Sequence, residues 1–482
     1  MAGSLTSPPH ERREAPLIEV TIDALDERGD GVGHVNGMPV TVPFTIPGER
    51  VRAAPAGRAA VAGTIRAVLT EVILPSPHRA RPVCAHFGPQ ASGAGPCGGC
   101  AWQHIAYAEQ LRIKTAIVDE VVRRAVPRAP RVRQMLAATP DHPWGFRRKV
   151  HFVFGRAGRD GRLVMGHLAR GSRRVVEVRE CPVHAEAGNR IAFAMHEAYH
   201  RAGVRAWTSG DPRAGALRGV AVRVSGDESQ AVATLIVAHD RDRRLRNATK
   251  RLIAAQAAGR GLHLNVHGRD DGFIFGAETR KLAGVDRVRE TIAGVSFLIS
   301  PTAFFQTNAA AAEVLVHLVL DAVPPDLPVL DLYAGAGLFT LPLAWRGQQV
   351  TAIEENREAV RDGIASQALN RIPKERCRWI ARPVEAGLAR VRATGAVVLD
   401  PPREGCSDQV LRSVCSDRGP VLAVYISCNP GTLGRDLSAI TRHGYSVTSV
   451  QPVDMFPHTP HIETVVALTR DSTTGQGPRA KG

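Results

Sequence analysis

Hydrophobic and polar residues follow different patterns in successive parts of the chain. Between residues 17 and 74, short runs rich in β-branched residues are separated by turns such as Gly29-Asp30-Gly31 and Asn36-Gly37. This pattern predicts short strands and tight turns, as in a small β-barrel. From Tyr107 to Ala125, apolar residues recur at the spacing of one helix face, which predicts an amphipathic helix.

The middle and the C-terminal parts differ in the order of their elements. Residues 144–290 mix strands with helices, which predicts an α+β domain, with expected strands at Val150–Phe154, Val175–Val178, Val220–Val224 and Val232–Val237 and a helix at Gly188–Ala202. From Phe297 onward strands alternate with helices, the pattern of a doubly wound α/β sheet. Its expected strands are Pro328–Tyr333, Gln349–Ile353, Val397–Leu399, Val421–Ile426, Tyr445–Val450 and Thr464–Leu468.

Length and composition set the limits of this scheme. A chain of 482 residues is too long for one core, and 44% hydrophobic with 22% charged residues is ordinary for a soluble protein. We expect residues 1–15 to be disordered, 16–75 to form the barrel, 76–290 the central domain, 291–470 the α/β domain and 471–482 a tail. No run of 18 apolar residues occurs, and residues 1–15 lack the apolar core of a signal peptide, so we expect no membrane span and a cytoplasmic location.

The charge is concentrated. The formal net charge is +16, and residues 112–180 hold 17 Lys and Arg against six Asp and Glu. Such a block fits a polyanion such as nucleic acid, although a basic surface that only aids solubility would look the same. The barrel segment is poor in aromatic residues, with Phe44 almost alone, which favours backbone contacts over base stacking. Phe146, Arg147 and Arg148 are candidate contacts.

One cysteine stands at the end of a predicted core strand. The apolar run Val421–Ile426 predicts a strand buried on both faces, and Ser427-Cys428-Asn429-Pro430 interrupts it. Cys428 is therefore expected at the carboxyl end of the strand, where open α/β sheets bind their ligands. A catalytic nucleophile and a buried structural cysteine both fit this stretch taken alone.

A glycine-containing turn, Asp331-Leu-Tyr-Ala-Gly335-Ala-Gly337, joins a predicted strand to a predicted helix. Glycines let the backbone approach a ligand closely at a helix N-terminus. Glu354 ends the next strand, where a carboxylate can hold both ribose hydroxyls of a nucleoside. A dinucleotide site would favour Gly or Ala where this chain has Thr340, so S-adenosylmethionine is the favoured cofactor. A dinucleotide and a turn without a ligand are the alternatives.

Three other stretches combine polar groups with predicted core strands. Asp400 is followed by Pro401-Pro402-Arg403, so its carboxylate could bond a base edge or a cofactor, although amino-group methyltransferases often place an aromatic where Arg403 stands. Glu463 begins an apolar strand, an expensive place for a charge without a task. Phe304–Asn308 offers two aromatic rings and two amides that fit a pocket for an adenosyl group or a base. A strand-ending turn, a solvated glutamate and core aromatics are the simpler interpretations.

Together these motifs resemble one family, the RNA uracil-5-methyltransferases that use S-adenosylmethionine. The resemblance covers about residues 17–470, and it implies an N-terminal β-barrel of the TRAM type, a central domain and a C-terminal Rossmann-like methyltransferase domain. It also implies site roles at the matching positions: Cys428 as nucleophile, Glu463 as base, and Gln306, Tyr333, Glu354 and Asp400 as cofactor ligands. Thiolate attack on carbon 6 of uracil would make carbon 5 nucleophilic, and a base would then remove the carbon 5 proton.

A second group of cysteines points to a metal. Family members with a TRAM domain often carry a [4Fe–4S] cluster on a C-x5-C-x2-C run plus one distant cysteine. This chain has Cys84, Cys97 and Cys100 at C-x12-C-x2-C, with Cys181 further on. The longer first spacing can loop out because the entropy of a loop grows slowly with its length. An iron–sulfur cluster is the favoured prediction, and zinc on the same four thiolates or no metal at all are the alternatives.

The sequence therefore predicts a monomeric enzyme that methylates carbon 5 of a uridine in RNA, with 23S ribosomal RNA favoured over transfer RNA. The nearest rival enzyme is an RNA cytosine-5 methyltransferase, which would use a second cysteine near Asp400, and Cys406 keeps it open. A rival of another class is a non-catalytic RNA-binding or ribosome-assembly protein, which the presence of Cys428 and Glu463 disfavours.

Overall fold

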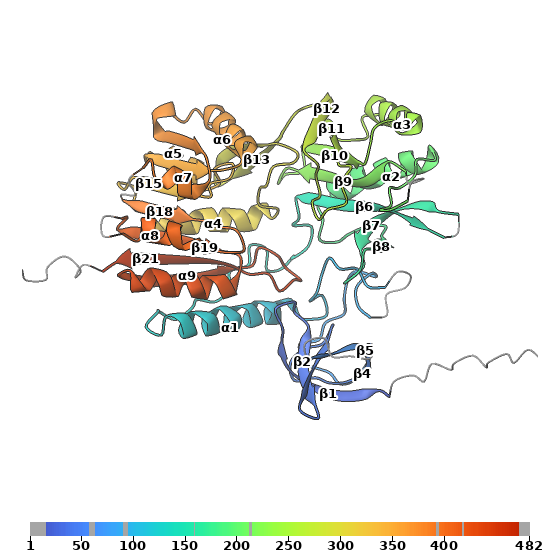
Figure 1. Cartoon of the computed structure of the whole chain (residues 1–482), viewed down its shortest axis with the longest axis horizontal. Helices are drawn as coiled ribbons and strands as arrows, with labels where there is room; N and C mark the ends of the chain where they lie inside the picture. The colour runs from blue at the N-terminus through green and yellow to red at the C-terminus, as the bar shows by residue number, and fades with distance from the viewer. Residues whose placement is uncertain are drawn as a thin grey trace, which may run out of the picture. The chain divides into compact units, whose positions relative to one another are not determined.

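The computed structural model describes residues 16–56, 63–89, 95–158, 160–211, 215–391, 395–416 and 419–471 (Figure 1). The predicted disordered segment, residues 1–15, lies outside these ranges. The predicted tail, except for its first residue, and residues 90–94 of the insertion between Cys84 and Cys97 also lie outside them. Internal contacts divide the chain into two units. Unit 1 comprises Met1–Pro96, Cys100–Ala106 and His458–Pro460, and unit 2 comprises Cys97–Gly99, Tyr107–Pro457 and His461–Gly482.

Unit 1 contains the predicted β-barrel. It is closed by five strands in the order β1-β2-β3-β5-β4. The strands are β1 (Ile18–Leu25), β2 (Gly31–Val35), β3 (Met38–Val42), β4 (Arg50–Pro55) and β5 (Ile65–Leu74). Phe44 is buried in the barrel core, where its ring meets Phe87 edge to face at a centroid distance of 5.0 Å. The lone aromatic of this segment is thus used for packing.

The middle of unit 2 is built on a seven-stranded sheet in the order β12-β11-β10-β9-β6-β7-β8. Its strands are β6 (Lys149–Ala157), β7 (Arg162–Leu168), β8 (Val175–Glu177), β9 (Leu217–Val224), β10 (Ala231–Val237), β11 (Gly261–Val266) and β12 (Glu278–Gly284). All neighbours are antiparallel except β10 and β11, which α3 (Arg243–Ala254) connects. Helix α2 (Glu186–Arg201) packs on β6, β7, β9 and β10 and on α3. This confirms a mixed α and β arrangement.

The C-terminal part of unit 2 is the predicted α/β sheet, in the order β17-β16-β15-β18-β19-β21-β20. Its strands are β15 (Val329–Leu332), β16 (Val350–Glu354), β17 (Cys377–Ala381), β18 (Ala396–Leu399), β19 (Leu422–Ser427), β20 (Tyr445–Val453) and β21 (Glu463–Arg470). The first five strands in this order are parallel, whereas β21 runs antiparallel to both β19 and β20. The hairpin of β13 (Val288–Ile292) and β14 (Val295–Ile299) precedes this sheet.

Helices cover both faces of this sheet (Figure 1). One core combines the hairpin with α4 (Ala309–Ala322), α5 (Thr340–Trp345) and residues packed near α6 (Arg357–Leu369), while the other combines α7 (Val384–Leu388), α8 (Asp408–Val414) and α9 (Pro430–Arg442). A 3-10 helix, Lys374–Arg376, leads into β17. Strand residues alternate between the two cores, as Val398 and Leu399 do, so strands that look apolar throughout are buried on both sides.

Helix α1 (Tyr107–Ala125) forms as predicted and joins the second of these cores. Val118 and Val122 pack there, and α1 contacts α9. Lys114 donates to Asp454 at 2.6 Å, and both side chains are fully buried. Tyr107 donates to the same carboxylate at 2.7 Å. A helix that precedes the central sheet in sequence is therefore fixed to the C-terminal sheet.

None of the helices in the described ranges is both long enough and apolar enough to cross a membrane.

Candidate active site

The topology of the C-terminal sheet gathers the predicted catalytic and cofactor residues at one edge. Strands β15, β16, β18 and β19 are parallel, so their carboxyl ends share an edge, and β21 begins at that edge because it runs antiparallel to β19. Polar side chains stand at each of these strand ends: Tyr333, Glu354, Asp400, Cys428 and Glu463. This edge is where open α/β sheets bind ligands.

Cys428 and Glu463 lie beside each other across two paired strands. Ser427 at the end of β19 is paired with Thr464 of β21, so the next residue of the first strand faces the start of the second. Cys428 is partly exposed, whereas Glu463 is 4% exposed. A partly exposed thiol and a buried carboxyl thus meet at the ends of these two strands.

The charges of this site act on one another. Burial raises the pKa of Cys428 to about 11, with smaller contributions from Glu463 and Asp400, while Arg403 opposes the rise. Burial likewise raises the pKa of Glu463 well above its usual value, Asp400 adds to the rise and Arg403 again opposes it. Arg403 is thus the cation that favours the charged forms of both groups.

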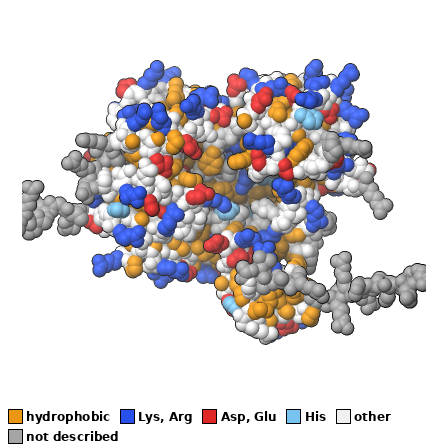
Figure 2. Space-filling model, viewed as in Figure 1, with side chains coloured by type: hydrophobic (Ala, Val, Ile, Leu, Met, Phe, Trp, Pro, Cys, Tyr) orange, Lys and Arg blue, Asp and Glu red, His pale blue; other side chains and the backbone are white. Residues whose placement is uncertain are grey.

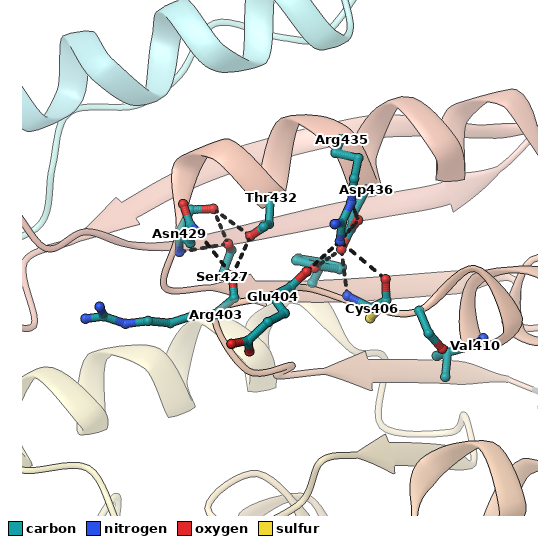
Figure 3. A network of polar contacts seen from close by, with 11 residues as sticks. Arg403, Glu404, Cys406, Val410, Ser427, Asn429, Thr432, Arg435 and Asp436 are labelled. Carbon is teal, nitrogen blue, oxygen red and sulfur yellow. Dashed lines mark hydrogen bonds and ion pairs between the residues drawn. The ribbon is translucent and has the colours of Figure 1, made fainter. Parts of the chain in front are cut away.

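Hydrogen bonds hold the turn that carries Arg403 against the start of α9 (Figure 3). The backbone carbonyl of Arg403 accepts from the side-chain amide of Asn429 at 3.1 Å and from the hydroxyl of Thr432 at 3.2 Å. Asn429 also caps α9 by accepting from Gly431 N at 3.0 Å. The guanidinium extends away from this network and lies 3.3 Å from Nδ1 of His461. The backbone is fixed while the charged end remains at the site.

Cys406, the second cysteine that an RNA cytosine-5 methyltransferase would need, lies in the core. It is 4% exposed, and its backbone N–H donates to Asp436 at 2.8 Å (Figure 3). Burial, followed by the charge of Asp436, raises the pKa of its thiol to about 12. Asp436 also accepts from the buried hydroxyl of Tyr425. A buried thiol of high pKa is a poor nucleophile, so the structure disfavours this rival.

The turn after β15 has the features of a nucleoside site. Glu354 accepts from Gly335 N at 2.9 Å and from Asn356 N at 2.7 Å, which orients its carboxylate at the strand end. Gly335 has a φ of +56°, and a Cβ there would meet no atom within 4 Å, so space is open beside the turn. In the described part of the chain, Oδ1 of the buried Asp331 has no hydrogen-bond partner. The residues present therefore fit a polar ligand at this edge.

Two other carboxyls share the low polarity of this edge. Burial raises the pKa of Asp331 to about 7, and its other oxygen accepts from Thr340 at 2.5 Å. Burial, together with the charge of Asp331, raises the pKa of Asp400 to about 7. Perturbed carboxyls that influence one another at the end of a sheet are typical of a functional site. Asp331 stood in the glycine-turn motif, but nothing in the sequence indicated its buried, unpaired oxygen.

Tyr333 adopts a left-handed conformation, with a φ of +62°, which is costly for a residue with a side chain. Its ring packs against the core formed with α7, α8 and α9, and the neighbouring Cys406 and Glu385 add to the burial that raises the pKa of its hydroxyl. The ring therefore lies on the side of the sheet away from the hairpin. Its predicted role as a cofactor ligand stays a prediction.

The motif Phe304–Asn308 is a fixed loop before α4. Phe305 is buried against Phe297, with ring centroids 5.3 Å apart, whereas Phe304 is 72% exposed. Asn308 caps α4 and donates to the carbonyl of Met455 at 3.1 Å. Gln306 is partly exposed on the same loop. Only one of the two aromatic rings is therefore free to meet a ligand, and the loop is joined to the segment that leads into Glu463.

A cleft beside Glu354 was not expected from the sequence. It is lined by Glu355, Asn356, Arg357, Ala381, Arg382 and Pro383, at the carboxyl ends of β16 and β17. Strand β17 escaped the sequence prediction because its five residues, Cys377–Ala381, include the charged Arg378 and show no clear apolar period. The cleft adjoins the acidic strand end that a nucleoside would use.

The four predicted metal ligands are divided between the units. Cys84 and Cys100 belong to unit 1, where both pack against the barrel core, and Cys97 and Cys181 belong to unit 2. Within unit 2, Cys181 has His167 and His184 near it, with one potential ligand atom of each lying within 4.8 Å of the others. The sequence prediction did not include these histidines. A cluster on the four thiolates remains a prediction.

The predicted RNA contacts at residues 146–148 differ in their surroundings. Phe146 is 7% exposed and belongs to the core, so its prediction as an RNA contact was wrong: its ring is used for packing. Arg148 donates to Glu228 at 2.8 Å. Burial lowers the pKa of the His461 imidazole to about 4, and the charge of Arg403 adds to this effect. Arg147 lies near His461 and makes a smaller contribution in the same direction. Arg147 is thus the residue of the three that is placed toward the active site.

Basic, acidic and hydrophobic side chains are interspersed over the visible face (Figure 2).

Comparisons with known proteins agree with this geometry. A family model described as tRNA (Uracil-5-)-methyltransferase matches residues 223–471. Uncharacterised RNA methyltransferases of Thermosynechococcus vestitus and Gloeobacter violaceus are 33% and 35% identical to this chain, each over 95% of it and over 99% and 97% of their own length. The crystal structure of Pyrococcus abyssi tRNA (uracil-54, C5)-methyltransferase with S-adenosyl-L-homocysteine superposes with a TM-score of 0.73, covering 94% of this chain and all of that one. At 23% identity, this last likeness concerns the fold.

Proposed function

This chain belongs to the tRNA (uracil-5-)-methyltransferase family, and on that premise we propose that it methylates carbon 5 of a uridine in RNA through a covalent bond between Cys428 and carbon 6 of the base. The observation that carries the proposal is the strand register that sets Cys428 beside Glu463 at the ligand-binding edge. S-adenosylmethionine is the methyl donor that we propose.

The reaction requires a nucleophile because carbon 5 of uracil is itself unreactive. The thiolate of Cys428 adds to carbon 6, and the electrons of the carbon 5–carbon 6 double bond move onto the ring as an enolate. Carbon 5 would then take the methyl group from the donor's sulfonium, whose sulfur–methyl bond would break to leave a neutral thioether. Glu463 removes the proton from carbon 5, the double bond forms again, and the bond between carbon 6 and sulfur breaks to release the thiolate. One cysteine and one carboxylate suffice for this series of reaction steps.

The surroundings of the two groups suit these tasks. The raised pKa of Glu463 makes its ionised form a stronger base than an exposed carboxylate. Arg403, which opposes the pKa rises of Cys428 and Glu463, stabilises negative charge at the moment that the thiolate forms. A target base must leave its stack to reach a site at the end of a buried strand.

The cofactor would be held by groups at the neighbouring strand ends. When bound, S-adenosylmethionine supplies an electrophilic methyl group on a sulfonium. Glu354 would accept hydrogen bonds from the ribose hydroxyls, because two backbone N–H groups already orient its carboxylate. Gln306, Tyr333 and Asp400 are the other ligands that we propose. The free oxygen of Asp331 and the open space at Gly335 support a polar ligand there.

The substrate that we propose is 23S ribosomal RNA, because the resemblance links a barrel and a cysteine cluster to large-subunit RNA. Mapping 5-methyluridine in the RNA of a strain that lacks the gene tests this directly. Loss of one 5-methyluridine from 23S ribosomal RNA, restored by the wild-type gene and not by a Cys428→Ala copy, is the expected result. Loss from transfer RNA instead would reject the ribosomal substrate and keep the chemistry.

We also propose a [4Fe–4S] cluster on Cys84, Cys97, Cys100 and Cys181, whose thiolates fit either that cluster or zinc. A cluster would cross-link segments that lie far apart in the sequence. Protein purified without oxygen is expected to be brown and to contain about four irons per chain. Serine in place of any one of the four cysteines should lower the iron content.

His184→Ala separates this cluster from the metal site that His167, Cys181 and His184 could form in unit 2. The cluster prediction requires that iron content survive this substitution. Zinc in the wild-type protein, lost on replacing either Cys181 or His184 but retained in Cys84→Ser, would contradict the cluster and favour the histidine-containing site.

Binding of RNA is expected to depend steeply on salt, because phosphate contacts release counterions. Replacing Arg147 and Arg148 by alanine should weaken binding to cognate and unrelated RNA alike and flatten the log–log salt slope by about 1 to 2. The ion pair of Arg148 with Glu228 predicts that most of the change comes from Arg147, so Arg148→Ala serves as the comparison. An unchanged slope in the double variant would place the RNA elsewhere.

A further inference from the structure

The loop between β11 and β12 presents apolar side chains to solvent. Phe273 is 72% exposed and Ile274 is 47% exposed, and they are adjacent. Isolated apolar residues on a surface are common, but here two large ones stand together at the tip of one loop. The mechanism described above does not use them.

The backbone of this loop is firmly held. The buried Asn265 donates to the carbonyl of Gly276 at 3.0 Å and accepts from its N–H at 2.8 Å, which closes the base of the loop. His267, 1% exposed, lies 3.0 Å from the carbonyl of Phe273 and 3.1 Å from Asp271. Phe273 N donates to that aspartate at 3.0 Å. These bonds involve the backbone of Phe273 and leave its ring in water.

A cation–π contact and two hydrogen bonds connect this loop with the active-site loop that holds Gln306. The ammonium of Lys149 lies 4.9 Å from the ring centroid of Phe275. The same ammonium donates to the carbonyl of Ala303 at 3.3 Å, and Arg223 donates to that carbonyl at 2.9 Å. Ala303 precedes Phe304, which is 72% exposed. The exposed rings of Phe273 and Phe304 therefore stand on two loops that both contact the ammonium of Lys149.

The charge of this region suits an anion. Lys149 and the buried Arg223 converge on one carbonyl, and Nε of Arg223 has no hydrogen-bond partner among the described residues. Arg218 adds a third cation by donating to the carbonyls of His267, at 2.7 Å, and Arg269. Arg223 is 3% exposed and serves to hold the backbone, whereas Lys149 and Arg218 are partly exposed. Accessible cations beside exposed rings are the combination by which proteins hold single-stranded RNA, because cations meet phosphates and rings meet bases.

We propose that Phe273 and Ile274 form a stacking site, called the step below, on which an unpaired RNA base that flanks the target uridine packs. This inference rests on the proposed function, and it adds a second base-binding position to the one beside Cys428. A firm loop loses little freedom when a base stacks on it, which favours binding. Stacking accepts any base, so the step would favour unpaired strands over duplexes without selecting a sequence.

Anisotropy of a short fluorescein-labelled single-stranded RNA of mixed sequence, and of its duplex, tests the step. Phe273→Ala is expected to weaken single-strand binding about 5- to 160-fold, because one stacked base is lost. The salt slope should not change, because no phosphate contact is lost. Phe273→Trp should retain the affinity, and duplex binding should be the same in all variants. Equal melting temperatures would show that the fold is intact.

Trp345→Ala is the matched control, because Trp345 is 60% exposed and ends α5, far along the chain from the loop and outside the site. It should bind like the wild type. Unchanged single-strand binding in Phe273→Ala, or an equal loss for the duplex, would overturn the proposal and leave the step for a protein partner. Failure of the proposed function is separable, because it would show as a wild-type protein that forms no Cys428-dependent adduct with RNA containing 5-fluorouridine.

Discussion

Cys428→Ala is expected to abolish methylation, lowering kcat by on the order of 10⁴-fold or more, as removal of other catalytic nucleophiles does. Without the thiolate, carbon 5 of uracil does not become nucleophilic. Binding of RNA and of the methyl donor should persist, since the side chain is small and partly exposed. The measurement is transfer of labelled methyl groups to RNA from the deletion strain.

Cys406→Ala is the control for this prediction. Cys406 is 4% exposed and its thiol has a raised pKa, so the variant should keep activity within several-fold. Loss of activity in Cys406→Ala with retention in Cys428→Ala would reverse the assignment and revive the cytosine-5 chemistry.

The thiol of Cys428 also predicts a dependence on pH. Its pKa is raised to about 11, so at neutral pH the thiol is almost wholly protonated in the substrate-free protein. The thiolate fraction then rises about tenfold for each pH unit until the pKa is approached. The rate of covalent bond formation with RNA should therefore rise with pH between about 7 and 9. A rate that falls over this range would contradict attack by this thiolate.

Glu463→Gln is expected to lower turnover by about 10²- to 10⁴-fold, the usual contribution of a general base. The carboxamide keeps the shape of the side chain but cannot take the carbon 5 proton. The methyl group should still be transferred once, so a methylated RNA–protein adduct should accumulate. A denaturing gel with labelled methyl donor would show the label moving with the protein.

Glu404→Gln tests whether loss of any nearby carboxylate has the same effect. Glu404 is exposed in the turn next to Arg403, and its variant should turn over like the wild type. If Glu463→Gln also turns over normally, the buried carboxyl is structural and the base lies elsewhere.

Much of the fold could be predicted from the sequence because the spacing of apolar residues and the positions of the turns agree with the packing in the structure. The helix at Tyr107–Ala125 was predicted to the residue, and the strand before Cys428 was found because both its faces are apolar. Strands β13, β14 and β17 were missed, since each has only five residues, and β13 and β17 also mix charged with apolar positions. Short strands are defined by their neighbours in the sheet, which sequence spacing does not reveal.

The strand-end positions of the candidate residues were predictable from the sequence, whereas their environment was not. The chain order placed Cys428 and Glu463 at strand ends, but only the antiparallel pairing of β19 with β21 sets them side by side. The cation that acts on both, Arg403, appeared in the sequence merely as a departure from another methyltransferase pattern. Phe146 failed as an RNA contact because an aromatic beside two arginines gives no sign of whether it faces the core.

The most direct test of the central claim is the mass of the peptide that carries RNA after reaction with 5-fluorouridine. Fluorine cannot leave carbon 5 as a proton does, so the adduct should persist through digestion. We predict one modified peptide, containing Cys428 with a methylated 5-fluorouridine attached at its sulfur. A modified peptide that contains another cysteine, or no adduct under conditions in which ordinary RNA is methylated, would contradict the account.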